Sequence, residues 1–284
     1  MRLARLLSLF ALLLLAAAVL LLRARRDVTA GIVLGFCATF KLPLFLLLAY
    51  FAWRNRWRVM AGSALSSGGL FGLSIGVFGW AAHVSWFELC VAPFLAGTIP
   101  AFNVQSIDGF LMRLDTGTRL LREWEPLARP MVQSIVRAAI LVVLFGAAYL
   151  AFRVSLPPDD GDRSKSAAPS GRDVELEFSI VLMLALVSSP VSWTHYYHLM
   201  LLPWSLLLGG VLKGKLGGAS RMLFLISVLL SSLPVVDVPE VSPPIREVLA
   251  RTLISAWLFG GLALLTALII ERRQMGHSKA EGVT

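Results

Sequence analysis

Long apolar runs alternate with short basic clusters along most of the chain. A helix needs about 20 apolar residues to cross the hydrocarbon core of a bilayer, so runs of this kind predict membrane-spanning helices. The runs lie at 6–22, 30–52, 59–82, 131–152, 176–190, 196–212, 219–236 and 250–270. The pattern predicts an all-α, polytopic integral membrane protein with about 7–8 hydrophobic helices, folded as a single transmembrane domain over residues 1–284.

Three polar stretches interrupt the apolar runs. Residues 83–130 combine aromatic residues, Pro, Gly and scattered charge, which predicts a loop with an amphipathic element at the membrane surface. Residues 154–175 are hydrophilic and predict a flexible linker. Residues 237–247 form a short, Pro-rich connection.

Composition also favours a membrane protein, because 57% of the 284 residues are apolar and only 15% are charged. Soluble chains are nearer half apolar and a quarter charged. The net charge of +9 would suggest nucleic acid in a soluble protein, but here the basic residues form clusters at the ends of the apolar runs. We therefore expect membrane lipids as partners and no nucleic acid.

The positive-inside rule gives these helices an orientation. The arginines at 272–273 place the C-terminal end in the cytoplasm, and the successive spans then put residues 83–130 outside and residues 154–175 inside. The assignment fails at the first basic cluster, 23–26. That cluster would lie outside if 30–52 crossed the membrane completely.

The segment 30–52 carries a break at Phe40-Lys41-Leu42-Pro43. Proline removes a backbone donor and interrupts a helix, so two half-helices that enter and return would leave both basic flanks in the cytoplasm. Broken helices occur at membrane depth where protein or a wet cavity surrounds them. We favour this re-entrant arrangement, and the alternative is a single kinked span.

Lys41 is the first candidate functional residue. A lysine among apolar neighbours is costly unless it meets a polar cavity or an anion. It lies about 11 residues from either flank of its run, which is deep for a lysine that snorkels to the interface, the competing interpretation. We therefore favour a phosphate-binding cation.

The second candidate stretch, 188–198, holds two of the four histidines and two of the four tyrosines. His195 and His198 share a helix face, but no third ligand follows at a recognisable spacing, so we expect no metal. An interfacial aromatic belt explains Trp193 and the tyrosines. It does not explain His195, for which we favour a hydrogen bond to an anion or to an acceptor hydroxyl.

The third stretch, 103–114, places polar side chains, a carboxylate and an arginine beside apolar residues. This suits an amphipathic element lying over a site, and a solvated surface turn is the alternative. Arg113 has the planar fork that binds phosphate. Asp108 is a candidate general base by its location.

Together, the stretches 30–43, 103–114 and 189–195 resemble glycosyltransferase family 87. These polytopic enzymes of the GT-C type were long catalogued as a domain of unknown function, and they include mycobacterial mannosyl- and arabinofuranosyltransferases. The resemblance implies a GT-C-like bundle of many transmembrane helices in a plasma membrane, here expected to be bacterial. It places the active site on the extracytoplasmic face.

The resemblance also implies the reaction. A sugar, expected to be a hexose such as mannose, passes from a polyprenyl-phosphate donor to a lipid-linked or cell-envelope glycan acceptor, without a nucleotide, a metal or a cofactor. Carried over by position, His195 is the catalytic candidate near the reacting centre. The substrate- and phosphate-binding candidates are Lys41, Arg113, Asn103, Gln105 and Trp193.

Family members carry further helices before this region, and an acidic residue in their first external loop is the expected general base. The chain opens on what corresponds to a middle helix of the family, so we expect a C-terminal portion of the fold. Two alternatives stay open. One is a polyprenyl-lipid flippase or transporter, because a broken helix with a buried cation also suits an anionic substrate at mid-membrane. The other is an inactive fragment that lacks the catalytic acidic residue.

Overall fold

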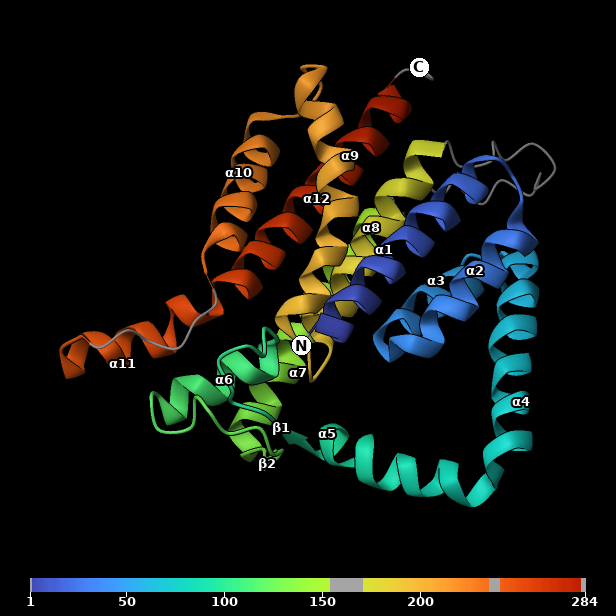
Figure 1. Cartoon of the computed structure of the whole chain (residues 1–284). Helices are drawn as coiled ribbons and strands as arrows, with labels where there is room; N and C mark the ends of the chain where they lie inside the picture. Colours follow the sequence, from blue (N-terminus) through green and yellow to red (C-terminus); the bar gives the residue numbers. More distant parts are fainter. Residues whose placement is uncertain (1, 154–170, 235–240, 282–284) are drawn as a thin grey trace.

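The computed structural model describes residues 2–153, 171–234 and 241–281, and helices dominate it (Figure 1). The two short strands pair antiparallel in one small ribbon. In chain order the elements are α1 (Arg2–Arg23), α2 (Asp27–Phe40), η1 (Leu42–Leu44), α3 (Phe45–Trp53), α4 (Trp57–Cys90), α5 (Ala92–Ala96), β1 (Gly97–Thr98), α6 (Ile107–Thr116), β2 (Leu127–Ala128), α7 (Met131–Arg153), α8 (Gly171–Ser188), η2 (Thr194–Met200), α9 (Leu201–Leu212), α10 (Gly218–Ser232), α11 (Pro243–Arg251), η3 (Leu253–Ser255) and α12 (Ala256–Glu281).

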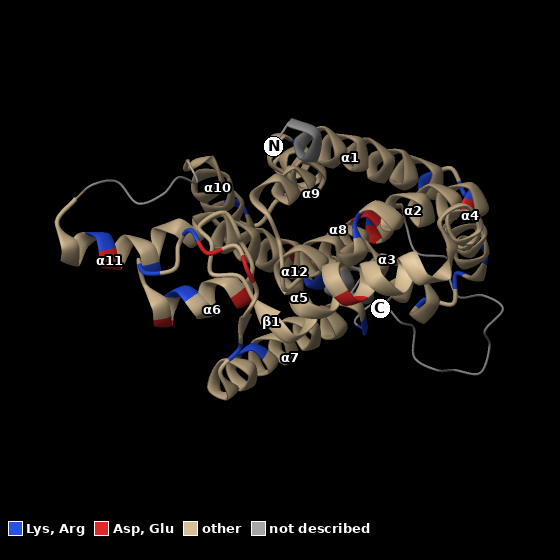
Figure 2. Cartoon of the chain, turned by 60° about the horizontal axis from the view of Figure 1, so that its bottom comes forward, with Lys and Arg blue, Asp and Glu red and all other residues tan. Residues whose placement is uncertain are grey.

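The prediction of an all-α membrane protein is confirmed, whereas the predicted number of helices is not. Charged residues gather at helix ends and on α6 and α11 (Figure 2). Within the described residues, four segments are long and apolar enough to cross a membrane: Leu6–Arg23, Trp57–Ala96, Met131–Arg153 and Pro243–Met275. Shorter apolar helices cover Asp27–Phe40, Leu42–Trp53 and Gly218–Ser232.

The broken segment returns to the side from which it starts. α2 has 14 residues and α3 has 9, or about 21 and 14 Å at 1.5 Å per residue, so neither alone spans about 30 Å of hydrocarbon. Between them Lys41 is extended and Pro43 lies in η1. Arg56 Nη2, just after α3, lies 2.7 Å from Asp27 Oδ1 at the start of α2. The two ends of the segment therefore lie close together.

Small residues let α2 pack closely against the first half of α4. A Cβ at Gly31 would overlap the carbonyl oxygen of Val59. One at Gly35, a turn further along α2, would overlap Ser63 and Ser66, also further along α4. Because the contacts advance together along both helices, α2 and α4 run in the same direction and begin at the same end of the bundle.

The loop predicted at 83–130 begins inside a helix. α4 continues to Cys90 but bends sharply at Gly79, whose φ of 78° is a conformation that glycine adopts readily (Figure 1). The remainder of the stretch contains α5, the β1–β2 ribbon and α6. The predicted amphipathic element corresponds to α6, which the Ser106 hydroxyl caps by accepting a hydrogen bond from Gly109 N at 3.1 Å.

Helix α8 is the centre of the bundle, and α1, α3, α7, α9 and α12 pack around it. Its residues are almost all buried from Asp173 onward. The prediction of a flexible linker at 154–175 is therefore wrong for residues 171–175, which form the first turn of α8; residues 154–170 lie outside the described residues. Ion pairs of Asp173 with Arg272 and of Glu175 with Arg23 hold this turn in place.

The ion pairs bring several basic clusters to one end of the bundle. We call the end that holds Arg23, Arg54, Arg56 and Arg272 the basic end. The opposite end, with α6, α11 and residues 189–195, is the loop end (Figure 1). The two ends correspond to the two sides that the charge pattern distinguishes.

Candidate functional site

Two of the three candidate stretches are joined by backbone hydrogen bonds at the loop end. Gln105 N donates to Ser192 O at 2.6 Å, and Thr194 N donates to Asn103 O at 3.0 Å. These bonds form an antiparallel bridge in which Val104 pairs with Trp193. Residues 103–105 and 192–194, which are far apart in the sequence, thus form one unit, which we call the platform. The spacing of the motifs along the sequence could not show this contact.

Lys41 brings the third stretch to the same place. Its side chain is 5% exposed, and Nζ lies 3.4 Å from the centroid of the Tyr196 ring. The negative face of an aromatic ring attracts a cation. The buried ammonium between α2 and α3 therefore rests on a protein ring next to His195.

A cavity of about 530 Å³ opens beside this contact. Its volume is in the range of small-molecule sites, and its walls are largely apolar with a few hydroxyl groups. Trp193, one of the predicted substrate-binding residues, lines it and stacks on Trp124 with ring centroids 5.8 Å apart. The lining includes Thr39, Phe40, Pro43, Ser189, Pro190 and Tyr196.

His195 follows directly on this aromatic wall. Its ring meets the Tyr196 ring edge-on, with centroids 4.8 Å apart. His198 turns back on the chain, and its Nδ1 donates to His195 O at 2.8 Å. Lys41, Tyr196 and His195 thus form a chain of contacts. No group of three or more His, Cys, Asp or Glu side chains suited to a metal ion occurs within the described residues.

Arg113 is completely buried beneath the platform rather than directed into the cavity. Its Nη1 donates to the carbonyl oxygens of Ala101 at 3.0 Å and Val104 at 2.9 Å, and its Nη2 donates to Ser255 Oγ at 2.9 Å. Burial lowers the pKa of the guanidinium to about 9, so Arg113 remains charged at neutral pH. These contacts favour a positioning role over direct contact with a phosphate.

Gln105 is likewise buried and satisfied by the protein. Its Nε2 donates to Ile254 O at 2.7 Å, and its backbone carbonyl oxygen accepts from the Tyr197 hydroxyl at 2.6 Å. Asn103 is partly buried, and its carbonyl oxygen takes part in the bridge to Thr194. Both residues therefore hold the platform against η2 and η3, and neither contributes to the cavity wall.

Asp108 lies between two arginines. Its carboxylate accepts from Arg137 Nε at 2.8 Å and lies 3.2 Å from Arg129 Nε. Burial raises the pKa of this carboxyl, even though the two guanidinium groups act in the opposite direction. With only 2% of its surface exposed, Asp108 is better placed to fix α6 on α7 than to take a proton from a substrate.

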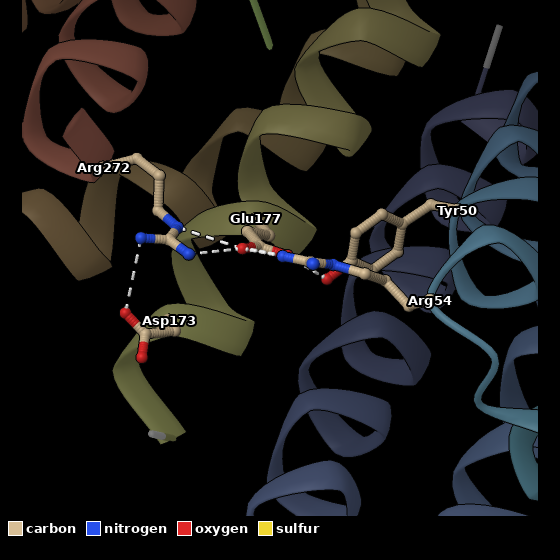
Figure 3. Close-up of polar contacts among 5 residues, drawn as sticks. All are labelled: Tyr50, Arg54, Asp173, Glu177 and Arg272. Carbon is tan, nitrogen blue, oxygen red and sulfur yellow. Dashed lines mark hydrogen bonds and ion pairs between the residues drawn. The ribbon is translucent and has the colours of Figure 1, made fainter. Parts of the chain in front are cut away.

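The structure also shows a polar cluster that the sequence analysis did not single out (Figure 3). At the basic end, Glu177 accepts hydrogen bonds from the Tyr50 hydroxyl at 2.6 Å, from Arg272 Nη2 at 2.6 Å and from Arg54 Nε at 2.9 Å. Asp173 lies 3.6 Å from Arg272 Nη1. The only sequence signal was the presence of carboxylates at the start of an apolar run, which also fits a solvated helix end.

A comparison with protein families identifies the chain. Residues 7–168 match the model of glycosyltransferase family 87. The matched range includes Lys41, Asp108 and Arg113 and ends before Trp193 and His195. No curated protein and no solved structure matches the chain. Because the family match covers more than half of the 284 residues, the chain belongs to glycosyltransferase family 87 and is a membrane glycosyltransferase.

Proposed function

We propose that this protein transfers a hexose, such as mannose, from a polyprenyl-phosphate donor to a lipid-linked or cell-envelope acceptor on the extracytoplasmic face of the plasma membrane. The main support is Lys41, a buried cation at the tip of a broken helix pair, beside an apolar cavity at the loop end. The charge pattern assigns the loop end to the outside of the membrane.

Lys41 has the right chemistry for the donor phosphate. When the bond between the sugar carbon and the phosphate oxygen breaks, negative charge grows on the departing polyprenyl phosphate. A fixed ammonium aimed at that charge stabilises the transition state, and it does so more strongly in a site that excludes water. Within the described residues, Lys41 has no carboxylate partner, and the Tyr196 ring is a weaker partner than a phosphate.

His195 is the residue that we assign to the acceptor. The new bond forms between the acceptor oxygen and the sugar carbon, and the acceptor hydroxyl loses its proton as this happens. An imidazole can accept that proton or hydrogen-bond the hydroxyl. The ring contact with Tyr196 places His195 beside the residue that holds the phosphate-binding cation.

The remaining candidates support these two residues. Trp193 shapes the cavity wall, and the buried side chains of Gln105 and Arg113 keep the platform in register with η2. We therefore assign Gln105, Asp108 and Arg113 to positioning, since their polar groups are directed at the protein itself, and Asn103 as well, because its backbone carbonyl holds the bridge to Thr194.

The test is a transfer assay with the purified full-length chain in lipid nanodiscs, a panel of radiolabelled polyprenyl-phosphate hexoses and membrane-derived acceptor. Lys41→Met and His195→Ala should each reduce transfer by more than tenfold with normal expression. Lys215→Met, at an exposed lysine of the basic end, is the matched control and should retain wild-type transfer. Wild-type rates in both site variants would remove the site assignment.

The same preparation separates an enzyme from a transporter. Labelled donor is enclosed in liposomes that contain the protein, and both the product and the side on which the donor appears are followed. Glycosylated acceptor supports the proposal. Movement of intact donor across the bilayer without transfer would favour a flippase instead.

A further inference from the structure

The basic end contains a second cavity, separate from the one at the loop end. Its volume is about 490 Å³, and it lies between the C-terminal end of α1, the end of α3 and the start of α8. Four arginines and two carboxylates line it together with apolar side chains. The charged lining residues are Arg23, Arg25, Arg54, Arg56, Asp27 and Glu175, and the apolar ones include Val19, Leu22 and Val174.

Most of this charge is already paired within the protein. Arg23 pairs with Glu175 at 2.5 Å, Arg56 pairs with Asp27 at 2.7 Å, and Arg54 binds Glu177. Among the described residues, Arg25 has no ion-pair partner. Because Arg23 and Arg25 are exposed, the cavity presents an excess of positive charge to a group entering from the membrane surface.

Two turns of similar geometry carry these arginines. Arg25, between α1 and α2, has a φ of 58°, and Asn55, between α3 and α4, has a φ of 55°. Each turn is closed by hydrogen bonds of the same spacing, from Arg26 N to Leu21 O at 2.9 Å and from Arg56 N to Phe51 O at 3.0 Å. Bonds of this spacing close Schellman motifs, the helix ends at which a left-handed residue is common, and in the first turn that residue is an arginine.

The surroundings of the cavity indicate the chemical class of the ligand. Guanidinium groups bind phosphate with two parallel hydrogen bonds. The cavity lies at the end of the apolar span Leu6–Arg23, and its wall continues into apolar residues of α1 and α8. The end of a span that crosses the hydrocarbon core meets the lipid headgroups. Basic pockets between membrane helices on this side attract anionic headgroups. We infer that this cavity binds the phosphate headgroup of an anionic membrane phospholipid.

The experiment uses the full chain purified in an uncharged detergent and native mass spectrometry with added lipid. Phosphatidylglycerol is titrated against wild type and against Arg25→Asn, because asparagine removes the charge and tolerates the left-handed conformation. Arg58→Gln is the matched control, since Arg58 is an exposed arginine of the same basic region that does not line the cavity. Phosphatidylcholine and inorganic phosphate are measured alongside.

We expect phosphatidylglycerol to bind wild type at least fivefold more tightly than phosphatidylcholine. Arg25→Asn should weaken it at least fivefold, and Arg58→Gln less than twofold. Equal effects of both substitutions, or equal binding of both lipids, would overturn the inference. Complete displacement of the lipid by millimolar inorganic phosphate would assign the cavity to free phosphate and overturn the lipid assignment. The measurement does not depend on transfer activity, so it fails or succeeds independently of the proposed reaction.

Discussion

The two ends of the bundle differ in whether a buried charge has an oppositely charged partner within the protein. At the basic end, Glu177 is 2% exposed and is surrounded by two arginines and a tyrosine hydroxyl (Figure 3). At the loop end, Lys41 is almost as deeply buried, but its ammonium rests only on the Tyr196 ring among the contacts described. The first charge is balanced inside the protein, whereas the second is left to attract an anion.

This contrast separates structural charge from functional charge. A buried ion pair gains little net stability over an apolar core, but the loss of one partner is strongly destabilising. A buried charge without a counterion lowers stability and is tolerated where it performs chemistry. We therefore expect substitutions at Glu177 to affect folding and substitutions at Lys41 to affect activity.

The largest expected effect is at Glu177. Glu177→Ala leaves the buried guanidinium of Arg272 without its main partner, and it should lower the free energy of unfolding by about 3–5 kcal/mol. Denaturant unfolding in mixed micelles measures this change. Glu175→Ala, two residues away, removes a pair whose Arg23 side chain is 57% exposed and should cost about 1 kcal/mol or less. Equal losses in the two variants would contradict the contrast.

The second largest effect is expected for Arg113→Met. Arg113 lies at the loop end, but its buried charge is bonded to the protein itself, as the charge of Glu177 is. Several carbonyl oxygens lose their donor, and each buried group left unpaired costs about 1–3 kcal/mol. We expect unfolding to become easier by about 2 kcal/mol or more and transfer to fall in proportion to the folded fraction. Loss of transfer at unchanged stability would instead support the alternative hypothesis that Arg113 contacts the donor phosphate directly.

Substitutions at Tyr196 test the contribution of its ring, which is the weak partner of the Lys41 ammonium. Cation–π contacts are worth about 0.5–2 kcal/mol, so Tyr196→Leu should lower transfer by roughly two- to thirtyfold through a misplaced ammonium. Tyr196→Phe keeps the ring and should stay within about twofold of wild type. The ratio of the two rates at saturating donor is the measurement. A large loss with phenylalanine would show that the hydroxyl matters rather than the ring.

The smallest expected effect is on the stability of Lys41→Met. The methionine side chain fills a similar volume without a charge to desolvate, so the free energy of unfolding should stay within about 1 kcal/mol of wild type or rise. The same unfolding assay as for Glu177 gives the comparison. A loss as large as that of Glu177→Ala would make Lys41 a structural residue.

Much of the architecture could be predicted from the order of residues. Apolar runs, basic flanks and Pro43 are local features, and lipid demands that each backbone group be bonded within its own helix, so these features predict spans and the break at Lys41. The sequence analysis missed the first turn of α8, because carboxylates such as Asp173 and Glu175 are typical of solvent-exposed segments. Their partners, Arg272 and Arg23, come from α12 and α1 and are brought close only by the packing of these helices.

By itself, the sequence determined the membrane class, the helix break before Pro43 and the identity of Lys41 as a charge in apolar surroundings. Only the tertiary structure decided what each polar group meets. It directed Arg113 and Gln105 onto backbone carbonyls, enclosed Asp108 between Arg129 and Arg137, and set Lys41 on Tyr196. The physical reason is that the partner of a buried polar group comes from another helix, and its position is fixed only when the helices pack.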